Sequence, residues 1–527
     1  MKLKFRPIPI KLEIDPTRCM TTAFAGLMPY LDLWNALGMP RVVDKTVDIC
    51  GTQGWLDRQV VQSLVLLNLI GGDCVTDVEK LEDDAGLRAM VRVGEFSGMS
   101  REQKSKALKR FRGGRNRTFP APTQIYSFLE TCHNEAEEAK RVEGRAFIPT
   151  ANDHLKSLRA LNTALIARLQ ERRRQKVATL DCDATLVTTE NRSALFSYKG
   201  YRAYQPYNVW WAEQQVVVHS EFRDGNVPAG WNILPVLKDA VAALPSGVEQ
   251  VLMRQDTAAY QTEVMAWCER EREHPEYGRI LFTISADVTA TLRDEIMKVT
   301  STRMSQCDTD LTRFACWSPE YVARHGKQVP TGREWAELIY VPNAQAVLTD
   351  IFEPFRYIVV RERLGDQLRL LDVDSPLQQT DKLTGLPFPT MTMGNVAYKI
   401  GAIVTNRRSE GAAELIHWHY GRCGKSEEAH SIMKEDFSGG QMPSSKFGAN
   451  AAWWALMILS MNFESLLKRL VLGNAYVSRR MKAIRHALIN TAGRIVHHSR
   501  QYCLRVSHEF HNWLASLRER AVAQHMT

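Results

Sequence analysis

Two apolar segments of the sequence end in aspartates whose spacing suits metal chemistry. Asp181 and Asp183 lie in TLDCDATLV (Thr179–Val187), which predicts a buried strand, and Asp256 follows the apolar run in LMRQDTAAY. Open α/β sheets place their sites at strand ends, so we expect Asp183 and Asp256 to converge if these strands are neighbours. Neighbouring carboxylates repel each other unless a cation lies between them, and Mg²⁺ prefers such oxygen ligands. Each aspartate alone also suits a helix N-cap or a turn, so the pair carries the prediction.

A third acid is available in the segment His417–Gly440 (HWHYGRCGKSEEAHSIMKEDFSGG). On a helix, Glu427 and Lys434 are seven residues apart, which places them two turns apart on the same face. A carboxylate and an ammonium group on that face suit a metal ion and a phosphate group. The alternative is that Glu427, Glu428 and Glu435 form a solvated helix face.

The elements that must position these acids begin at about residue 175, where the hydrophobic period changes. The segments that follow predict the order β-β-β-α-β-α-β, a mixed α/β sheet with helical cover. They are Lys176–Val187 (strand), Tyr207–Gly225 (two strands), Trp231–Pro245 (helix), Val248–Asp256 (strand), Thr257–Glu273 (helix) and Gly278–Val288 (strand). Short alternating segments over residues 305–395 predict a β-rich insertion, and α/β patterning resumes at Val396–Asn406.

Residues 1 to about 170 have a mostly helical pattern. Arg58–Gly72 has an apolar face and a Gly-Gly stop, and Thr76 with Glu79 forms a capping box that predicts one helix as far as Val91. The basic run Arg101–Arg117 (REQKSKALKRFRGGRNR) follows. Helix, basic loop and helix suit a DNA-binding module, and they suit a small bundle with solvated basic faces equally well.

The charge of the chain favours an anionic partner such as nucleic acid. The 527 residues carry a formal net charge of +9, and Ser438 to the C-terminus holds 12 Lys and Arg against 3 Asp and Glu. We expect this segment to follow DNA backbone or to mediate subunit contacts. The cysteines show no CxxC pair, which indicates a reduced cytoplasmic protein. The start of the sequence has no signal-peptide pattern, and the longest apolar stretch, Ala451–Phe463, predicts a buried helix and no membrane span.

Together these motifs resemble the DDE transposases of bacterial insertion sequences, specifically the group-1 DDE transposase domain. The family's first acid lies in an LD-x-D-x-T strand, like LDCDAT, and its second in R-x-D-x-x-x-Y, like RQDTAAY. Its third lies in a Tyr/Arg/Glu/Lys signature, like Tyr420, Arg422, Glu427 and Lys434. The resemblance covers residues 175 to 470. In the wider superfamily Tyr and Arg are three apart and Arg and Glu four apart, whereas here the steps are two and five.

The resemblance implies a ribonuclease-H-like α/β fold and a site. Asp183, Asp256 and Glu427 would be the catalytic acids and would hold two Mg²⁺ ions, for which Mn²⁺ can substitute. Asp183 is preferred over Asp181 because the family aspartate precedes a small residue and often a Thr or Ser, and Glu427 over Glu428 because of the seven-residue step to Lys434. The DNA-binding residues would be Lys434, Arg422 and Tyr420. For Trp317 and Trp335, in the insertion, stacking on a DNA base competes with packing of the insertion's own core.

The resemblance also implies a DNA transposase, which cleaves the ends of an insertion sequence and transfers those ends to target DNA. Its partner would be double-stranded DNA, bound by a homodimer or larger assembly, in the cytoplasm at the nucleoid. The implied divisions are a mostly helical, DNA-binding region (1–170), a catalytic domain in two parts (175–304 and 396–470) around the β-rich insertion (305–395), and a basic helical C-terminal region (471–527). The alternatives are a stand-alone nuclease of the same fold and an inactive, domesticated DNA-binding protein.

Overall fold

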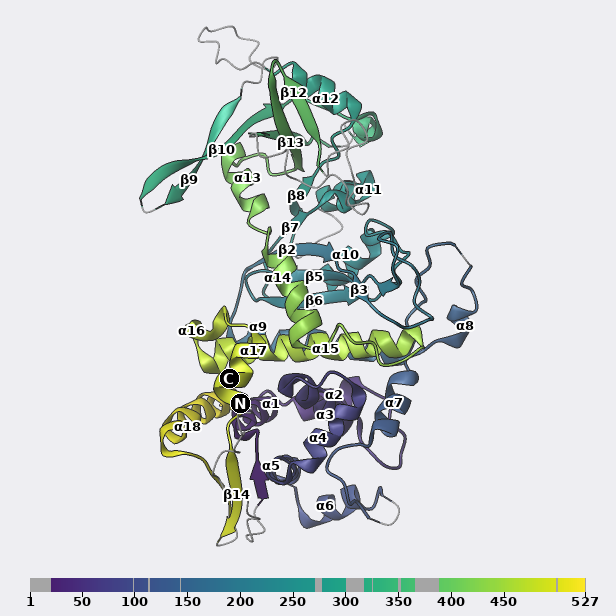
Figure 1. Ribbon diagram of the computed structural model, residues 1–527, viewed down its shortest axis with the longest axis vertical. Helices are drawn as coiled ribbons and strands as arrows, with labels where there is room; N and C mark the ends of the chain where they lie inside the picture. Colours follow the sequence, from purple (N-terminus) through teal and green to yellow (C-terminus); the bar gives the residue numbers. More distant parts are fainter. Residues whose placement is uncertain are drawn as a thin grey trace, which may run out of the picture.

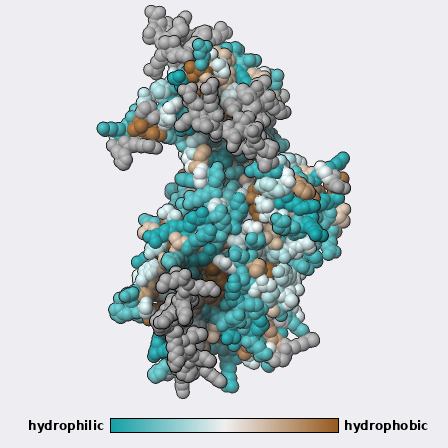
Figure 2. Space-filling view, viewed as in Figure 1, coloured by the Kyte–Doolittle hydropathy of each residue, from teal (hydrophilic) through white to brown (hydrophobic). Residues whose placement is uncertain are grey.

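The computed structural model is an elongated molecule, with helices at one end and a mixed β-sheet through its middle and other end (Figure 1). It describes residues 20–97, 99–111, 114–142, 144–270, 277–299, 317–324, 326–348, 352–364, 388–498 and 501–526. Figure 2 shows one face as largely hydrophilic, with hydrophobic side chains in small separate patches. Most hydrophobic residues instead belong to one buried cluster that extends from Leu27 to Ala521 along the chain.

The predicted mixed sheet and its order of elements are confirmed. The first five strands of the large sheet lie in the order β6-β5-β2-β7-β8; β5 and β6 are antiparallel to their neighbours and β7 and β8 are parallel to β2. This is a ribonuclease-H-like arrangement. The strands are β2 (Val177–Ala184), β5 (Tyr207–Trp211), β6 (Val216–Glu221), β7 (Gln250–Gln255) and β8 (Leu281–Ser285), and the helices between them are α10 (Ile233–Ala242) and α11 (Thr262–Glu269). A short hairpin that the sequence pattern did not predict follows β2 in the chain and precedes β5. It consists of β3 (Val187–Thr188) and β4 (Ala203–Tyr204), which form a separate two-stranded sheet.

The β-rich insertion continues the same sheet. After α12 (Ala290–Met297), the sheet extends from β8 in the order β13-β11-β10-β9, with β12 on the edge of β13. β13 is antiparallel to β8, with Ile403 opposite Ser285. The strands of the insertion are β9 (Ser318–Arg324), β10 (Lys327–Leu338), β11 (Arg356–Arg363) and β12 (Thr390–Met393), and β13 (Val396–Thr405) is the strand at which the predicted catalytic domain resumes. The insertion and the catalytic strands are therefore joined by backbone hydrogen bonds rather than by a flexible linker.

One long helix, α15 (Phe447–Leu467), lies between the sheet and the N-terminal helices (Figure 1). It contacts β6 of the sheet and the helices α3 (Asp57–Ile70), α7 (Pro122–Glu130) and α9 (Asp153–Arg172), which explains why nearly all of its residues are buried and apolar. Asn462 accepts a hydrogen bond from the backbone N of Val217 at 2.8 Å. Among the described residues, no single helix is long and apolar enough to cross a membrane; one bent pair, Asp57–Ile70 with Val75–Asp83, passes that test only when taken together.

The two ends of the described chain form one helical body. β1 (Met20–Thr22) pairs with the hairpin of β14 (Gly493–His498) and β15 (Gln501–Arg505), so the C-terminal region is not purely helical as expected. Arg518 on α18 forms an ion pair with Asp32 on α1 at 2.7 Å. The helices of this body are α1 (Met28–Ala36), α2 (Met39–Thr46), α3 (Asp57–Ile70), α4 (Val78–Asp83), α5 (Ala85–Phe96), α6 (Arg101–Leu108), α7 (Pro122–Glu130), α8 (Glu135–Glu138), α9 (Asp153–Arg172), α16 (Asn474–Val477), α17 (Met481–Ile484) and α18 (His508–Ala523).

The single helix predicted from Thr76 to Val91 is wrong, because the chain breaks at Asp84. Asp84 ends α4 and caps α5, accepting a hydrogen bond from the backbone N of Leu87 at 2.7 Å. Its second oxygen accepts from the backbone N of Ala23 at 2.8 Å. A tertiary contact with the segment after β1 thus fixes the break, and the local pattern does not contain that information.

Candidate active site

β2 carries Asp181 and Asp183 on the same face, since side chains two residues apart in a strand point the same way. Asp181 is buried, and its oxygens accept hydrogen bonds from Nε and Nη2 of Arg254 on β7, each at 2.7 Å. Asp183, at the end of the strand, keeps 25% of its side chain exposed. The carboxylate of Asp181 is therefore occupied by its ion pair with Arg254 inside the sheet, and Asp183 is the aspartate of this strand that a ligand can reach.

Asp256 lies beside Asp183 because β2 and β7 are parallel neighbours. Cys182 pairs with Gln255, so Asp183 and Asp256, which follow them, lie side by side at the same edge of the sheet. Asp256 caps the short 3₁₀ helix η3 (Thr257–Ala259) by accepting a hydrogen bond from the backbone N of Ala258 at 3.1 Å. The structure thus brings together the two strand ends that the sequence marks.

The environment of these two carboxylates disfavours their charged forms. Burial, followed by the negative charge of Asp256, raises the pKa of Asp183 to about 7, against the opposing charge of Arg422. Burial also raises the pKa of Asp256, and Arg422 again opposes the shift. Burying two carboxylates next to each other is unfavourable when both are charged. A divalent cation between them would relieve this repulsion, and carboxylate oxygens are the ligands that such a cation prefers.

We expect Asp183→Asn to stabilise the protein in EDTA at pH 8 but not at pH 4. The folded protein keeps a proton on Asp183 up to about pH 7, whereas an unfolded aspartate loses it near pH 3.9. The folded state therefore binds more protons in this range, and stability falls as the pH rises from about 4 to about 7. Thermal unfolding should give a variant Tm at least about 2 °C above wild type at pH 8. Equal gains at both pH values would show that the charge of Asp183 is not the cause.

Arg422 supplies positive charge at this sheet edge. It follows α13 (Ala412–Tyr420), and its Nη2 lies 3.8 Å from Oδ2 of Asp183. Burial alone would lower the pKa of Arg422, but the charges of Asp183 and Asp256 outweigh burial and raise the pKa. The guanidinium group therefore stays charged beside the two aspartates, where its planar donors suit a phosphate group.

Glu427 lies at the start of α14 (Lys425–Ser431) and is exposed. Its Oε2 accepts a hydrogen bond from the backbone N of Gly424 at 2.9 Å, which closes the first turn of its own helix. Its charge contributes to the raised pKa of Asp183, so the carboxylates interact electrostatically. Within the described part of the chain, no three Asp, Glu, His or Cys side chains lie close enough together to hold a metal ion. To share an ion with both aspartates, the Glu427 carboxylate would have to move closer to them.

Lys434 lies just beyond the end of β2. Its Nζ donates a hydrogen bond to the backbone O of Leu186 at 3.4 Å, and burial lowers its pKa. The helix that carries it is not the continuous α-helix we expected: α14 passes into the π-helix η7 (Ile432–Asp436), so the step from Glu427 to Lys434 is not two regular α-turns. Lys434 still lies at the sheet edge where β2 ends.

Tyr420 and Trp335 pack against a small apolar core of the β-rich part of the sheet, and Trp317 belongs to the large buried cluster. Tyr420 and Trp335 pack against the apolar cluster of Ile358, Val360, Ile403, Ala412, Leu415 and Ile416, and burial raises the pKa of Tyr420 to about 12. Trp317 is only 6% exposed, and the guanidinium of Arg361 lies 4.0 Å from its ring centroid. These placements favour core packing over base stacking for the two tryptophans.

Arg254, which the sequence analysis quotes only as part of RQDTAAY, and His419 hold α13 against the sheet. Arg254, besides pairing with Asp181, donates to the backbone O of Trp418 at 2.9 Å. His419 is buried, with Nδ1 2.8 Å from the hydroxyl of Thr283, and burial lowers its pKa to about 3. Arg254 had a signal in the sequence, because it lies two residues before Asp256 and so shares its face.

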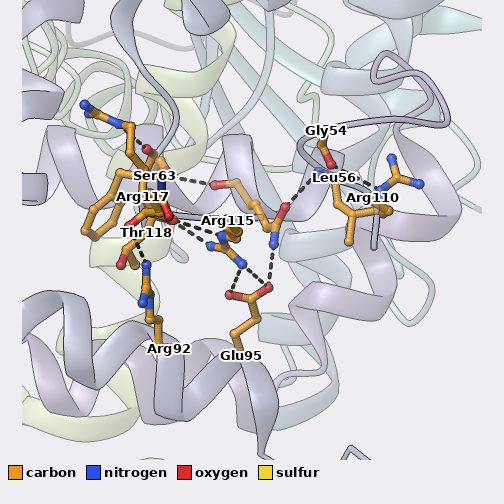
Figure 3. A network of polar contacts seen from close by, with 12 residues as sticks. Gly54, Leu56, Ser63, Arg92, Glu95, Arg110, Arg115, Arg117 and Thr118 are labelled. Carbon is orange, nitrogen blue, oxygen red and sulfur yellow. Dashed lines mark hydrogen bonds and ion pairs between the residues drawn. The ribbon is translucent and has the colours of Figure 1, made fainter. Parts of the chain in front are cut away.

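One half of the basic run Arg101–Arg117 packs against the helical body, and the other half is exposed to solvent. Arg115 forms a buried ion pair with Glu95, with Nη1 2.8 Å from both carboxylate oxygens (Figure 3). Arg110 donates to backbone carbonyls of the loop before α3, and these contacts hold the second half of the run against the helical body. α6, the first half, buries no residue. Its cations thus face solvent, where an anionic partner can reach them.

The basic C-terminal segment is also partly used inside the protein. Arg480 donates to Asp436 at 3.2 Å from Nε and 2.9 Å from Nη2, and Asp436 is 1% exposed. Arg485 donates to the backbone O of Leu69 at 2.8 Å. These contacts tie the π-helix that carries Lys434 to the helical body, so not every cation of this segment is free to follow DNA.

Comparison with known proteins gives the following. A family model described as transposase DDE domain group 1 matches residues 55–324, and Glu427 and Lys434 lie outside that match. The cryo-EM structure of a piggyBac transposase synaptic complex with hairpin DNA is similar at a TM-score of 0.39 and 7% identity, over 88% of this chain and 79% of that one. No curated protein matches. Because the family model covers just over half of the sequence, this chain belongs to the DDE transposases of group 1.

Proposed function

We propose that this DNA transposase cleaves the ends of an insertion sequence and transfers those ends to target DNA, with Asp183, Asp256 and Glu427 as its metal-binding acids. The observation that carries the proposal is the convergence of Asp183 and Asp256 at one sheet edge, beside the guanidinium of Arg422. Lys434 extends the positive charge along the same edge. An acidic pair flanked by cations suits a phosphodiester whose charge has to be neutralised while it is cut.

Mg²⁺, or Mn²⁺ in its place, would be held by the carboxylates of Asp183 and Asp256, and by Glu427 once its carboxylate moves closer to them. A bound pair of such ions stabilises the attacking and leaving oxygens of an in-line displacement at phosphorus. Arg422 and Lys434 would bind the non-bridging oxygens of the same phosphate and orient it. Burial and the charge of Asp256 raise the pKa of Asp183, so metal binding would displace a proton from it and the metal affinity should rise with pH. No nucleophilic side chain is required, because water and later a 3′-hydroxyl attack.

We further propose that the active assembly is a homodimer or larger, since joining two element ends to one target brings two cleavage sites together. The exposed α6 and the C-terminal cations not used in internal contacts are the surfaces we expect to follow DNA outside the site. Sizing with light scattering, with and without DNA ends, tests this: a complex with one subunit per pair of ends would contradict it.

The function is tested with DNA that carries the inverted repeats flanking the gene. With Mg²⁺, we expect cleavage at the repeat ends and their covalent joining to a target plasmid. Cleavage without joining would favour the stand-alone nuclease. Binding without either reaction would favour an inactive DNA-binding protein. Each product differs in length on a denaturing gel, so one assay separates the three functions.

We expect Lys434→Ala to weaken DNA binding to a similar extent on all sequences. A lysine that contacts phosphate contributes counterion release, so the slope of log K against log salt should become shallower by about 1. Fluorescence anisotropy at several salt concentrations measures the slope. Lys238→Ala, an exposed lysine on α10, is the matched control and should leave it unchanged. An unchanged slope for Lys434→Ala would place Lys434 away from the DNA.

A further inference from the structure

Two aromatic side chains stand out on the surface near the candidate site. Tyr198 is 66% exposed and Phe196 58%, more than any other aromatic residue that the structure describes. Both lie in the segment that joins β3 to β4, the hairpin between β2 and β5. Exposing large aromatic rings to water is unfavourable, and side chains of this kind that gather on a surface commonly mark a binding site.

The segment that carries them has a defined conformation. Gly200, with a φ of +80°, donates its backbone N–H to the carbonyl of Ser197 at 2.9 Å, and Ser197 donates to Tyr201 at 2.8 Å. This is a tight turn closed by a left-handed glycine, which puts Tyr198 and Lys199 at its tip. Across the hairpin the guanidinium of Arg202 lies 4.6 Å from the ring centroid of Phe196. The rings are therefore presented by a fixed turn rather than left exposed by a loose loop.

The base of the hairpin is attached to the chain that follows Lys434. Ser193 Oγ donates to the backbone O of Ser445 at 2.6 Å, and Asn191 donates to the backbone O of Ser444. Between the two segments lies a polar recess of about 460 Å³, lined by residues 188–191 and 440–445. The positive charge of Lys199 also lowers the pKa of Lys434, in addition to burial, so the two lysines interact electrostatically. The aromatic tip, the recess and the candidate site thus share one side of the sheet edge.

We infer that Tyr198 and Phe196 form a stacking platform for an unpaired base of the DNA strand that leaves the active site, with Lys199 and the recess along its backbone. The inference rests on the proposed function for the position of the DNA. Aromatic rings stack on any base, so the platform would be tolerant of sequence. The neighbouring cations favour nucleic acid over an apolar protein partner, because Lys199 and Arg202 flank the rings. Trp317 cannot take this role, because it is buried.

The test uses a forked duplex with 2-aminopurine in its unpaired arm, bound in EDTA so that no DNA is cut. We expect wild type to quench the fluorescent base. The double variant Phe196→Ala/Tyr198→Ala should bind at least about fivefold more weakly and lose the quenching. Tyr198→Phe keeps the ring and should behave as wild type. Tyr502→Ala removes a ring that is 53% exposed on β15, in the helical body, and should have no effect.

Unchanged affinity and quenching in the double variant would overturn the inference. So would a change of oligomeric state, seen by light scattering, with unchanged DNA binding, because the rings would then contact a second copy of the chain. Cleavage by wild type in Mg²⁺ is measured separately on the repeat ends. A wild type that quenches but never cleaves would contradict the proposed function and leave the platform standing, whereas a wild type that cleaves without quenching would do the reverse.

Discussion

Asp256→Asn should lower the rate of DNA cleavage by about three orders of magnitude while DNA affinity stays within about twofold of wild type. The asparagine keeps the size of the side chain and its cap on η3 but removes the negative charge that would hold a divalent ion. Metal ions contribute several kcal/mol to such a transition state, and each 1.4 kcal/mol is a factor of ten in rate. Single-turnover cleavage of labelled repeat ends, together with anisotropy in EDTA, measures both quantities.

A carboxylate at the end of the next parallel strand provides the control. Asp287 lies two residues beyond β8, is exposed, and is not among the residues that shift the pKa of Asp183. Asp287→Asn should therefore cleave as wild type does. If Asp256→Asn cleaved at the wild-type rate, the acids at the end of β2 and β7 would not be the catalytic ones, and the proposal would lose its central observation.

Arg254→Ala is expected to cause the largest loss of stability of any substitution considered. The ion pair with Asp181 has side chains only 8% and 3% exposed, so the variant leaves an unpaired carboxylate inside the sheet. Breaking a buried pair in this way costs about 3–5 kcal/mol. The variant also loses the hydrogen bond to the backbone O of Trp418, which holds α13 in place. Thermal unfolding of purified protein gives the effect as a shift in Tm.

Two further variants separate the buried charge from the lost contacts. Asp181→Leu/Arg254→Met removes both charges and should recover most of the stability, because an apolar pair of similar volume is often no less stable than a buried ion pair. Arg168→Ala breaks an exposed pair with Glu171 and should cost at most about 1 kcal/mol. An Arg254→Ala protein that unfolds at the wild-type temperature would mean that Asp181 is not held in the sheet as described.

The pattern of strand ends was enough to predict where Asp183 and Asp256 meet. Apolar runs that close on an aspartate specify the strand and its end, and parallel neighbours bring such ends together. The pattern could not decide between Asp181 and Asp183 from the residues alone, because the difference lies in Arg254 on the neighbouring strand. It also missed the hairpin that carries Tyr198, whose residues have no strand periodicity.

The limits of the sequence are clearest where distant segments set local geometry. The π-helix that carries Lys434 is accompanied by the Asp436–Arg480 contact, which joins residues 44 apart. β1 is a strand because it pairs with β14, and Met20 lies opposite Ile495. The Glu427 carboxylate turns to Gly424, a choice of side-chain conformation that helical spacing does not determine. In each case the deciding partner is outside the window that a local pattern covers.

The unbroken ladder from β8 to β13 has a mechanical consequence. A hinge between the catalytic strands and the insertion would have to rupture the pairing of β13 with β11, in which Arg356 lies opposite Thr405 and Arg363 opposite Tyr398, so we expect the ten strands to move as one plate. Adaptation to differently shaped DNA must then come from small parts at its rim, such as the left-handed turn at Gly424. A rigid sheet of this kind would require the DNA to bend to fit the protein surface. Stiff DNA would then be a poorer substrate than DNA that is easily deformed.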